Sequence, residues 1–247
     1  MPRLIGLHGK ARSGKDTTAD LIQSWCDAHH FTSARHGFAD KLKVSAAHAL
    51  GVFENEIDFC NSLKGDYERG FIEVRMATSG KGPNAVVSQI TGREFLQYYG
   101  TEAHREVFGS DFWVDSLLPE GEGNYRRVFE TKTEYDGSGN EVGSQGGMWG
   151  HPDWHSNFYS SRGRVADFCL VTDVRFDNEA ERILELGGSV WRIVRDGSGA
   201  GEHASEVELP GELVNVTIDN NGSLNDLSEA VETIMADVSQ LESISNG

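Results

Sequence analysis

Residues 4–20 read LIGLHGKARSGKDTTAD: a short apolar run, a glycine-containing turn and the first residues of a helix. The segment GKARSGK at 9–15 fits the pattern Gly-x-x-x-x-Gly-Lys, in the strand-to-helix context that a phosphate-binding loop requires. Gly9 and Gly14 let the backbone curl so that its amides point at phosphate oxygens, and the following helix adds the positive end of its dipole. Lys15 supplies a positive charge for the β- and γ-phosphates. This stretch therefore predicts a nucleotide-binding phosphate loop.

One position departs from the general loop pattern. Asp16 follows the lysine, where a serine or threonine usually holds magnesium, and Thr17 comes one residue later. The Asp16 carboxylate can bind the ion directly or through water, can orient Thr17, or can stabilise the helix N-terminus electrostatically. The residues alone leave these roles open.

The rest of the chain alternates between strand-like and helix-like segments. Short apolar runs predict strands at 33–38, 168–174, 189–194 and 213–219, the last one a half-exposed edge strand. Helical spacing predicts helices around 18–25, 39–50, 92–99, 111–118 and 176–186, and a last helix from Leu224 to Leu241 with Ser223 as its N-cap. Helices interleaved with short apolar strands predict a parallel sheet covered on both faces.

Composition and charge exclude several classes of protein. The 247 residues include 22 Lys and Arg against 39 Asp and Glu, a net charge of −17. This balance argues against nucleic acid or an anionic membrane as a partner, because both require a basic surface. Three cysteines without CxxC spacing indicate a reducing cytoplasm. No apolar run of about 18 residues predicts a membrane span.

Two stretches carry a weaker signal. Residues 52–91 are of mixed polarity, and residues 119–165 are rich in Gly, Ser, Trp and His, which is typical of an inserted loop or hairpin. His151 and His155 lie four residues apart in that insertion, but Pro152 and nearby glycines disfavour the helix that a metal site would need there.

Arginines follow the predicted strands at the edge where ligands collect in sheets of this kind. Arg12 lies in the loop, Arg175 follows the strand that contains Asp173, and Arg195 ends the next strand. Phosphoryl transfer requires positive charge on the phosphate oxygens and a second pocket for the acceptor, so Arg12 and Arg175 are candidates for these tasks. Asp173 is similar to the acidic residue that closes a Walker B strand, with either magnesium-bound water or the acceptor as its partner. Arg93 is intermediate between a functional arginine and a solvated surface charge. Arg182 and Arg192 are interpreted as solvated surface charges.

Several separated motifs together resemble the deoxynucleoside monophosphate kinases of large bacterial viruses. They are GKARSGKDTTAD at 9–20, FADKLK at 38–43, GTE at 100–102, DFWVD at 111–115, TDVRFDNEAE at 172–181, HASE at 203–206 and NNGSLNDL at 220–227. The resemblance includes the Asp16–Thr17 variant of the loop, and it covers most of the chain except about 52–90 and 119–165.

The resemblance implies an α/β fold of the P-loop kinase type, with a central parallel sheet of about five strands flanked by helices. It implies a single domain over 1–247, with a substrate-binding helical region at about 39–118, the insertion at about 119–165 and a lid-like segment at about 196–212. The implied reaction is ATP-dependent phosphorylation of a deoxynucleoside monophosphate to its diphosphate, with ATP and Mg²⁺ required. The resemblance leaves open whether the protein forms a homodimer.

Site residues carry over by position in these motifs. The residues expected to bind ATP and its magnesium are Arg12, Gly14, Lys15, Asp16, Thr17 and Thr18, with Asp16 and Thr17 as the metal ligands. The residues expected around the deoxynucleotide are Lys43, Arg93, Thr101, Trp113, Asp173, Arg175 and Glu179. Lys15 and Arg175 would be catalytic.

Two other functions fit the same loop. One is a kinase for another phosphorylated small molecule, such as phosphomevalonate; Trp113 and the nearby aromatic residues favour a stacked base instead. The other is a non-catalytic nucleotide-binding assembly factor, for which the second set of arginines would be unnecessary.

Overall fold

The computed structural model describes residues 2–65, 71–76, 86–119, 134–135, 141–143, 154–198 and 208–245. The chain divides into two compact units, each described by itself below. The sheet unit comprises Met1–His36 and Leu117–Gly247, and the helical unit comprises Gly37–Ser116.

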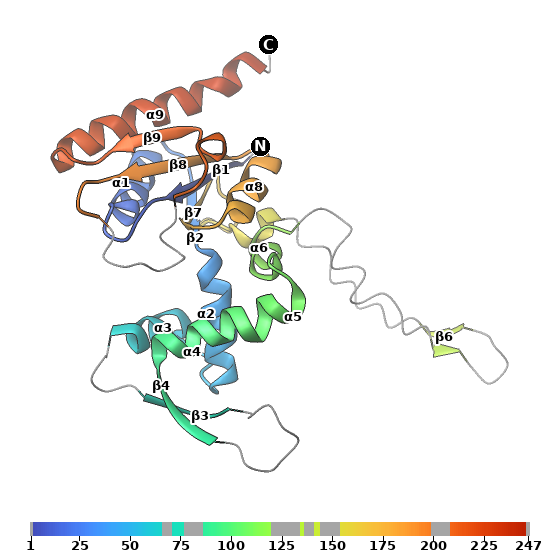
Figure 1. Cartoon of the computed structure of the whole chain (residues 1–247). Coiled ribbons are helices and arrows are strands. Elements are labelled where there is room, and N and C mark those ends of the chain that lie inside the picture. Colours follow the sequence, from blue (N-terminus) through green and yellow to red (C-terminus); the bar gives the residue numbers. More distant parts are fainter. Residues whose placement is uncertain are drawn as a thin grey trace. The chain divides into compact units, whose positions relative to one another are not determined.

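The sheet unit is built on a parallel five-stranded sheet with the order β2-β7-β1-β8-β9 (Figure 1). The strands are β1 (Arg3–His8), β2 (Ser33–His36), β7 (Phe168–Val174), β8 (Ser189–Val194) and β9 (Val216–Asp219). The first strand lies in the centre, and His8 at its end pairs with Val174 of β7 and Arg192 of β8. The carboxyl ends of these three strands therefore meet at one edge of the sheet, which is where such folds bind ligands.

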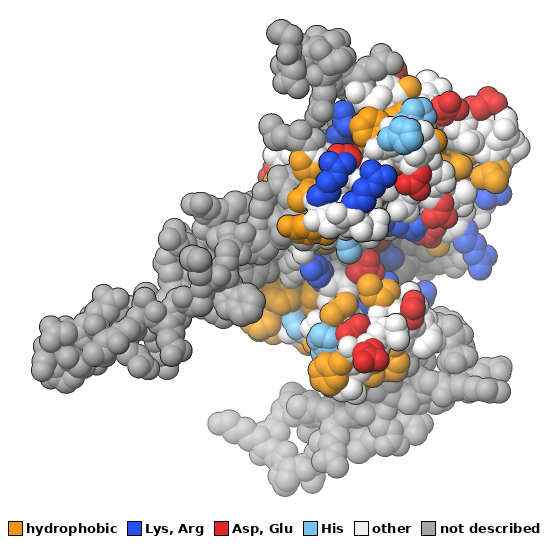
Figure 2. Space-filling model, turned by 180° about the vertical axis from the view of Figure 1, so that it is seen from behind, with side chains coloured by type: hydrophobic (Ala, Val, Ile, Leu, Met, Phe, Trp, Pro, Cys, Tyr) orange, Lys and Arg blue, Asp and Glu red, His pale blue; other side chains and the backbone are white. Residues whose placement is uncertain are grey.

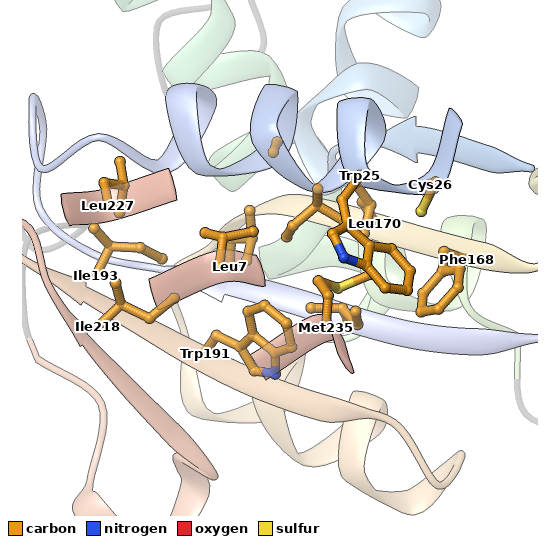
Figure 3. Close-up of a cluster of buried hydrophobic side chains, with 14 residues drawn as sticks. Leu7, Trp25, Cys26, Phe168, Leu170, Trp191, Ile193, Ile218, Leu227 and Met235 are labelled. Carbon is orange, nitrogen blue, oxygen red and sulfur yellow. The ribbon is translucent and has the colours of Figure 1, made fainter. Parts of the chain in front are cut away.

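Helices α1 (Lys15–Ala28) and α9 (Leu224–Ser245) cover one face of this sheet. Figure 3 shows their apolar side chains packed with Leu7, Leu170 and Trp191 from three neighbouring strands. Helix α8 (Asp177–Glu185) covers the other face, where its fully buried Ile183 packs against Gly6 of β1. Apolar side chains on both faces of the central strand explain why its sequence is a continuous apolar run.

The helical unit contains helices and one antiparallel hairpin. Its elements are α2 (Phe38–Ala49), α3 (Glu56–Gly65), β3 (Phe71–Met76), β4 (Val86–Thr91), α4 (Gly92–Gly100), the π-helical turn η1 (Thr101–Arg105), α5 (Glu106–Phe108) and the start of α6 (Phe112–Leu117). A small core of Ala46, Ala47, Cys60 and Leu96 joins α2, α3 and α4.

Most of the predicted elements are confirmed, with shifted ends. The α/β class, the parallel sheet of five strands and the flanking helices are present, and β9 lies at the edge of the sheet as expected. This strand begins at Val216 because Gly211–Leu213 form a short 3-10 helix, η4. Residues 52–91 carry no clear pattern in the sequence, and there the structure has α3 and the β3–β4 hairpin.

The insertion at 119–165 is described only in part. It contains an antiparallel pair, β5 (Glu134–Tyr135) with β6 (Glu141–Gly143), and the short 3-10 helix η2 (Trp154–Asn157). All three cysteines are buried thiols outside any disulfide, and burial raises the pKa of the Cys26 and Cys169 thiols to about 12. None of the helices in the described part of the chain combines the length and apolar character that a membrane span needs.

Candidate active site

The loop between β1 and α1 has an unusual backbone. Gly9, Arg12 and Gly14 all have positive φ angles, of 155°, 65° and 103°. The amide of Ser13 donates a hydrogen bond to the carbonyl of Lys10 (3.1 Å), which closes a turn inside the loop. A left-handed conformation at a non-glycine residue such as Arg12 is uncommon and is frequently found at functional sites.

Both glycines of the motif lie too close to other atoms for any side chain. A Cβ on Gly9 would lie 2.6 Å from the carbonyl oxygen of Ile193, and a Cβ on Gly14 would lie 2.3 Å from Nδ2 of Asn220. That Asn220 amide donates to the carbonyl of Ser13 (2.8 Å), and the backbone amide of Asn220 donates to the carbonyl of Val194 (2.8 Å). Asn220, at the end of β9, therefore fixes the loop against the sheet.

Lys15 begins α1 and directs its ammonium group back over the loop. Its Nζ donates to the carbonyl of Lys10 (2.8 Å) and to the carbonyl of Gly9. The charge thus lies above the loop backbone and is not buried in the core, which agrees with a role in phosphate binding.

The residues after Lys15 have different environments. Thr18 is fully buried, and both its amide (2.8 Å) and its hydroxyl (3.0 Å) donate to the carbonyl of Gly14, so this side chain stabilises the junction of loop and helix. Thr17 and Asp16 are exposed in the first turn of α1. The Asp16 carboxylate accepts a hydrogen bond from the guanidinium of Arg35 in β2, which also contacts Asp20 (2.9 Å). Sequence reasoning missed Arg35, because no local pattern indicates a partner 19 residues away.

The end of β7 places Asp173 and Arg175 at the same edge of the sheet as the loop. Arg175 follows Val174, which pairs with His8 directly before Gly9. Its side chain is exposed, and among the described residues its guanidinium has no ion-pair partner. The structure thus brings together two expected parts of the site: the phosphate loop and the turn at 174–176 between β7 and α8, which we call the Arg175 turn.

Glu179 has a role that its motif did not reveal. It is only 2 % exposed, and its carboxylate accepts hydrogen bonds from the backbone amides of Arg175 (2.7 Å) and Phe176 (3.1 Å). A carboxylate that binds orphan amides at a helix N-terminus stabilises that terminus. Glu179 therefore fixes the backbone that carries Arg175.

The other expected acceptor residues belong to the helical unit. Lys43 in α2 pairs with Asp40 (3.0 Å), Arg93 is exposed in the first turn of α4, and Thr101 is exposed at the start of the π-helical turn. Trp113 in α6 is 3 % exposed, and its indole nitrogen donates to the carbonyl of Gly100 (3.0 Å). Its ring packs against His104 and Phe112.

Some expectations fall outside the described residues. They include His151, residues 199–207 of the lid-like segment and the HASE motif at 203–206. Within the described ranges, no three His, Cys, Asp or Glu side chains gather as a metal site.

Charges of both signs are mixed on the described surface that Figure 2 shows. Lys and Arg side chains lie interspersed with Asp and Glu side chains there.

The sheet order and the glycine-rich loop after the central strand define a P-loop kinase fold. No family model matches the chain. The chain is similar along nearly its whole length to the deoxynucleotide monophosphate kinase of Enterobacteria phage T4, with 26% identity over 94% of this chain and 98% of the relative. It is 27% identical to the enzyme of the same name from Escherichia phage RB69, over 94% of this chain and 99% of the relative. A stretch of 54 residues, 21% of this chain and 22% of the relative, is 48% identical to the deoxynucleoside-5'-monophosphate kinase of Escherichia phage T5.

These comparisons confirm the resemblance drawn from the motifs and support an enzyme of the kinase class.

Proposed function

We propose that the protein transfers the γ-phosphoryl group of ATP to a deoxynucleoside 5'-monophosphate, giving the deoxynucleoside diphosphate and ADP. The observation that carries this proposal is the loop from Gly9 to Lys15, which lies beside the Arg175 turn at one edge of the sheet. The names of the relatives supply the acceptor.

The donor side of the reaction belongs to the loop. Its amides and the N-terminus of α1 would bind the phosphates of ATP, and Lys15 would place its charge on the β- and γ-phosphates. The Arg12 side chain is exposed on the loop and would add a second positive charge. Thr18 acts indirectly in this scheme, because its two donors hold Gly14 in place.

The acceptor side would use Arg175. Its guanidinium can fork onto the phosphate of the monophosphate with two parallel hydrogen bonds, while the Glu179 carboxylate holds its backbone. An oxygen of that phosphate attacks the γ-phosphorus, and the bond from the γ-phosphorus to the bridging oxygen of ADP breaks. Asp173, two residues before Arg175, would also contact the acceptor. For Lys43, Arg93, Thr101 and Trp113 of the helical unit, a role in binding the acceptor rests on the motif resemblance alone.

The metal that such kinases use fits the residues present. Mg²⁺ bound to nucleotide phosphates needs only one or two protein oxygen ligands, and the exposed Asp16 and Thr17 can supply them. When bound, Mg²⁺ would neutralise charge on the β- and γ-phosphate oxygens. Arg35 would then hold the Asp16 carboxylate in orientation.

The test is an assay for ADP formation with ATP and a panel of deoxy- and ribonucleoside monophosphates. Product analysis must show the matching diphosphate in equal amount to ADP. ADP formation without a diphosphate would indicate ATP hydrolysis, and no turnover with any monophosphate would refute the proposal.

A further inference from the structure

His8 is a buried polar residue at the junction of three segments of the sheet unit. It is the last residue of β1, directly before the loop, and it is 5 % exposed. In β1, His8 lies on the same face of the sheet as Gly6, where α8 packs, and the apolar Leu7 lies on the opposite face. A polar side chain at such a place needs hydrogen-bond partners.

Both ring nitrogens of His8 contact the backbone of distant segments. Nδ1 lies 3.0 Å from the carbonyl oxygen of Val174, and Nε2 accepts from the amide of Leu209 at 3.4 Å. Because a carbonyl only accepts and an amide only donates, the two contacts require a neutral ring with its proton on Nδ1. Burial lowers the pKa of His8, an effect that the Val174 carbonyl and Glu208 oppose and that Arg192 and Lys15 reinforce.

The two partners of His8 connect to the proposed catalytic parts. Val174 directly precedes Arg175. Leu209 is itself buried, its carbonyl accepts a hydrogen bond from the Arg192 guanidinium, and the neighbouring Glu208 pairs with Lys10 of the loop (3.7 Å). The segment Glu208–Leu209 is therefore bound to the loop, to the end of β1 and to β8.

We propose that His8 is a positioning residue that holds three segments in fixed spacing: the base of the phosphate loop, the Arg175 turn and the Glu208–Leu209 segment. His8 does not contact the reacting phosphates. It fixes the backbone from which the donor and acceptor groups extend. The catalytic part of this inference rests on the proposed function, whereas the structural part does not.

Three substitutions separate its contacts. His8→Leu removes both. His8→Asn keeps an amide donor near the position of Nδ1 and so retains the Val174 contact, and His8→Gln carries an acceptor to the position of Nε2 and retains the Leu209 contact. Thr32→Val is the matched control, because Thr32 is equally buried and hydrogen-bonds Asp167 (2.7 Å) just before the opposite end of β7.

For turnover of a deoxynucleoside monophosphate, we expect His8→Leu to lower kcat by about tenfold to a hundredfold, as small misplacements of reacting groups do. His8→Asn and His8→Gln should each recover part of the loss. Thr32→Val should lower the melting temperature without changing kcat. Equal kcat in His8→Leu and Thr32→Val would overturn the proposal.

Hydrogen exchange provides a readout that needs no turnover. His8→Leu should speed exchange of the amides at 9–14, 174–176 and 208–209, and Thr32→Val should speed exchange near 32–36 instead. If the wild-type protein phosphorylates no monophosphate, the proposed function fails, and the exchange pattern still decides the role of His8. Uniform acceleration along the chain in His8→Leu would show that the residue only stabilises the fold.

Discussion

Gly14→Ala tests the close packing of the phosphate loop on Asn220. An alanine at the φ of 103° would be strained by about 1–2 kcal/mol. Its Cβ would also lie 2.3 Å from Nδ2 of Asn220, so this amide must move and release the Ser13 carbonyl. A buried carbonyl without its partner costs about 1–3 kcal/mol, which gives a total of about 2–5 kcal/mol.

Asn220→Ala should cost only the second part, about 1–3 kcal/mol, because it removes the amide without straining the backbone. In the double variant the alanine at 14 no longer meets an amide, and the hydrogen bond is lost only once. The double variant should therefore resemble Gly14→Ala alone, with a coupling energy of about 1–3 kcal/mol.

Urea denaturation of the four proteins measures this coupling. Gly211→Ala is the control, because a Cβ there meets no atom within 4 Å, and the change should stay within about 0.5 kcal/mol. Additive effects of the two substitutions, or a Gly14→Ala protein as stable as the wild type, would refute the packing argument.

Three further predictions concern charge and catalysis. Lys15→Ala should raise the barrier to transfer by about 2.7–4 kcal/mol with an unchanged circular dichroism spectrum, and unchanged kcat would contradict the role of Lys15. Arg175→Lys should raise KM for the monophosphate while ATP affinity is kept, and Arg12→Lys should weaken ATP binding while KM for the monophosphate is kept. Arg162→Lys, at an exposed turn before β7, is the control and should change neither value. If both variants lose affinity for both ligands equally, both arginines bind the transferred phosphoryl group. Because burial lowers the pKa of His8, the unfolded chain binds its proton more readily, so this histidine should weaken stability as pH falls below about 6.5, by at most about 1.4 kcal/mol per pH unit. Denaturation at several pH values should show this loss in the wild type and a smaller one in His8→Leu.

The sequence predicted the parts of the fold that depend on local pattern. The period of α9 and its Ser223 cap are confirmed: the Ser223 hydroxyl donates to the Asp226 carboxylate (2.8 Å) and accepts from the Asp226 backbone amide (3.3 Å). The apolar runs of β1, β7 and β8 were equally clear, because strands buried on both faces have few polar residues.

The missed features depend on partners far away in the chain. Asn220 and Ser13 are 207 residues apart, and His8 and Val174 are 166 apart, so no local spacing could connect them. Glu179 belonged to a recognised motif, but its carboxylate binds backbone amides, which a motif of side chains does not reveal. Phe176 is the N-cap residue of α8, and the sequence did not indicate this cap because a capping box usually begins with serine or threonine.

The most direct test of the central claim is to incubate the protein with ATP, Mg²⁺ and each deoxynucleoside monophosphate in turn, and to quantify all nucleotides by chromatography. The account predicts ADP and one deoxynucleoside diphosphate in equal amounts, formed about a hundredfold to a thousandfold more slowly by Lys15→Ala. Absence of a diphosphate with every monophosphate, from a folded protein that binds ATP, would contradict it.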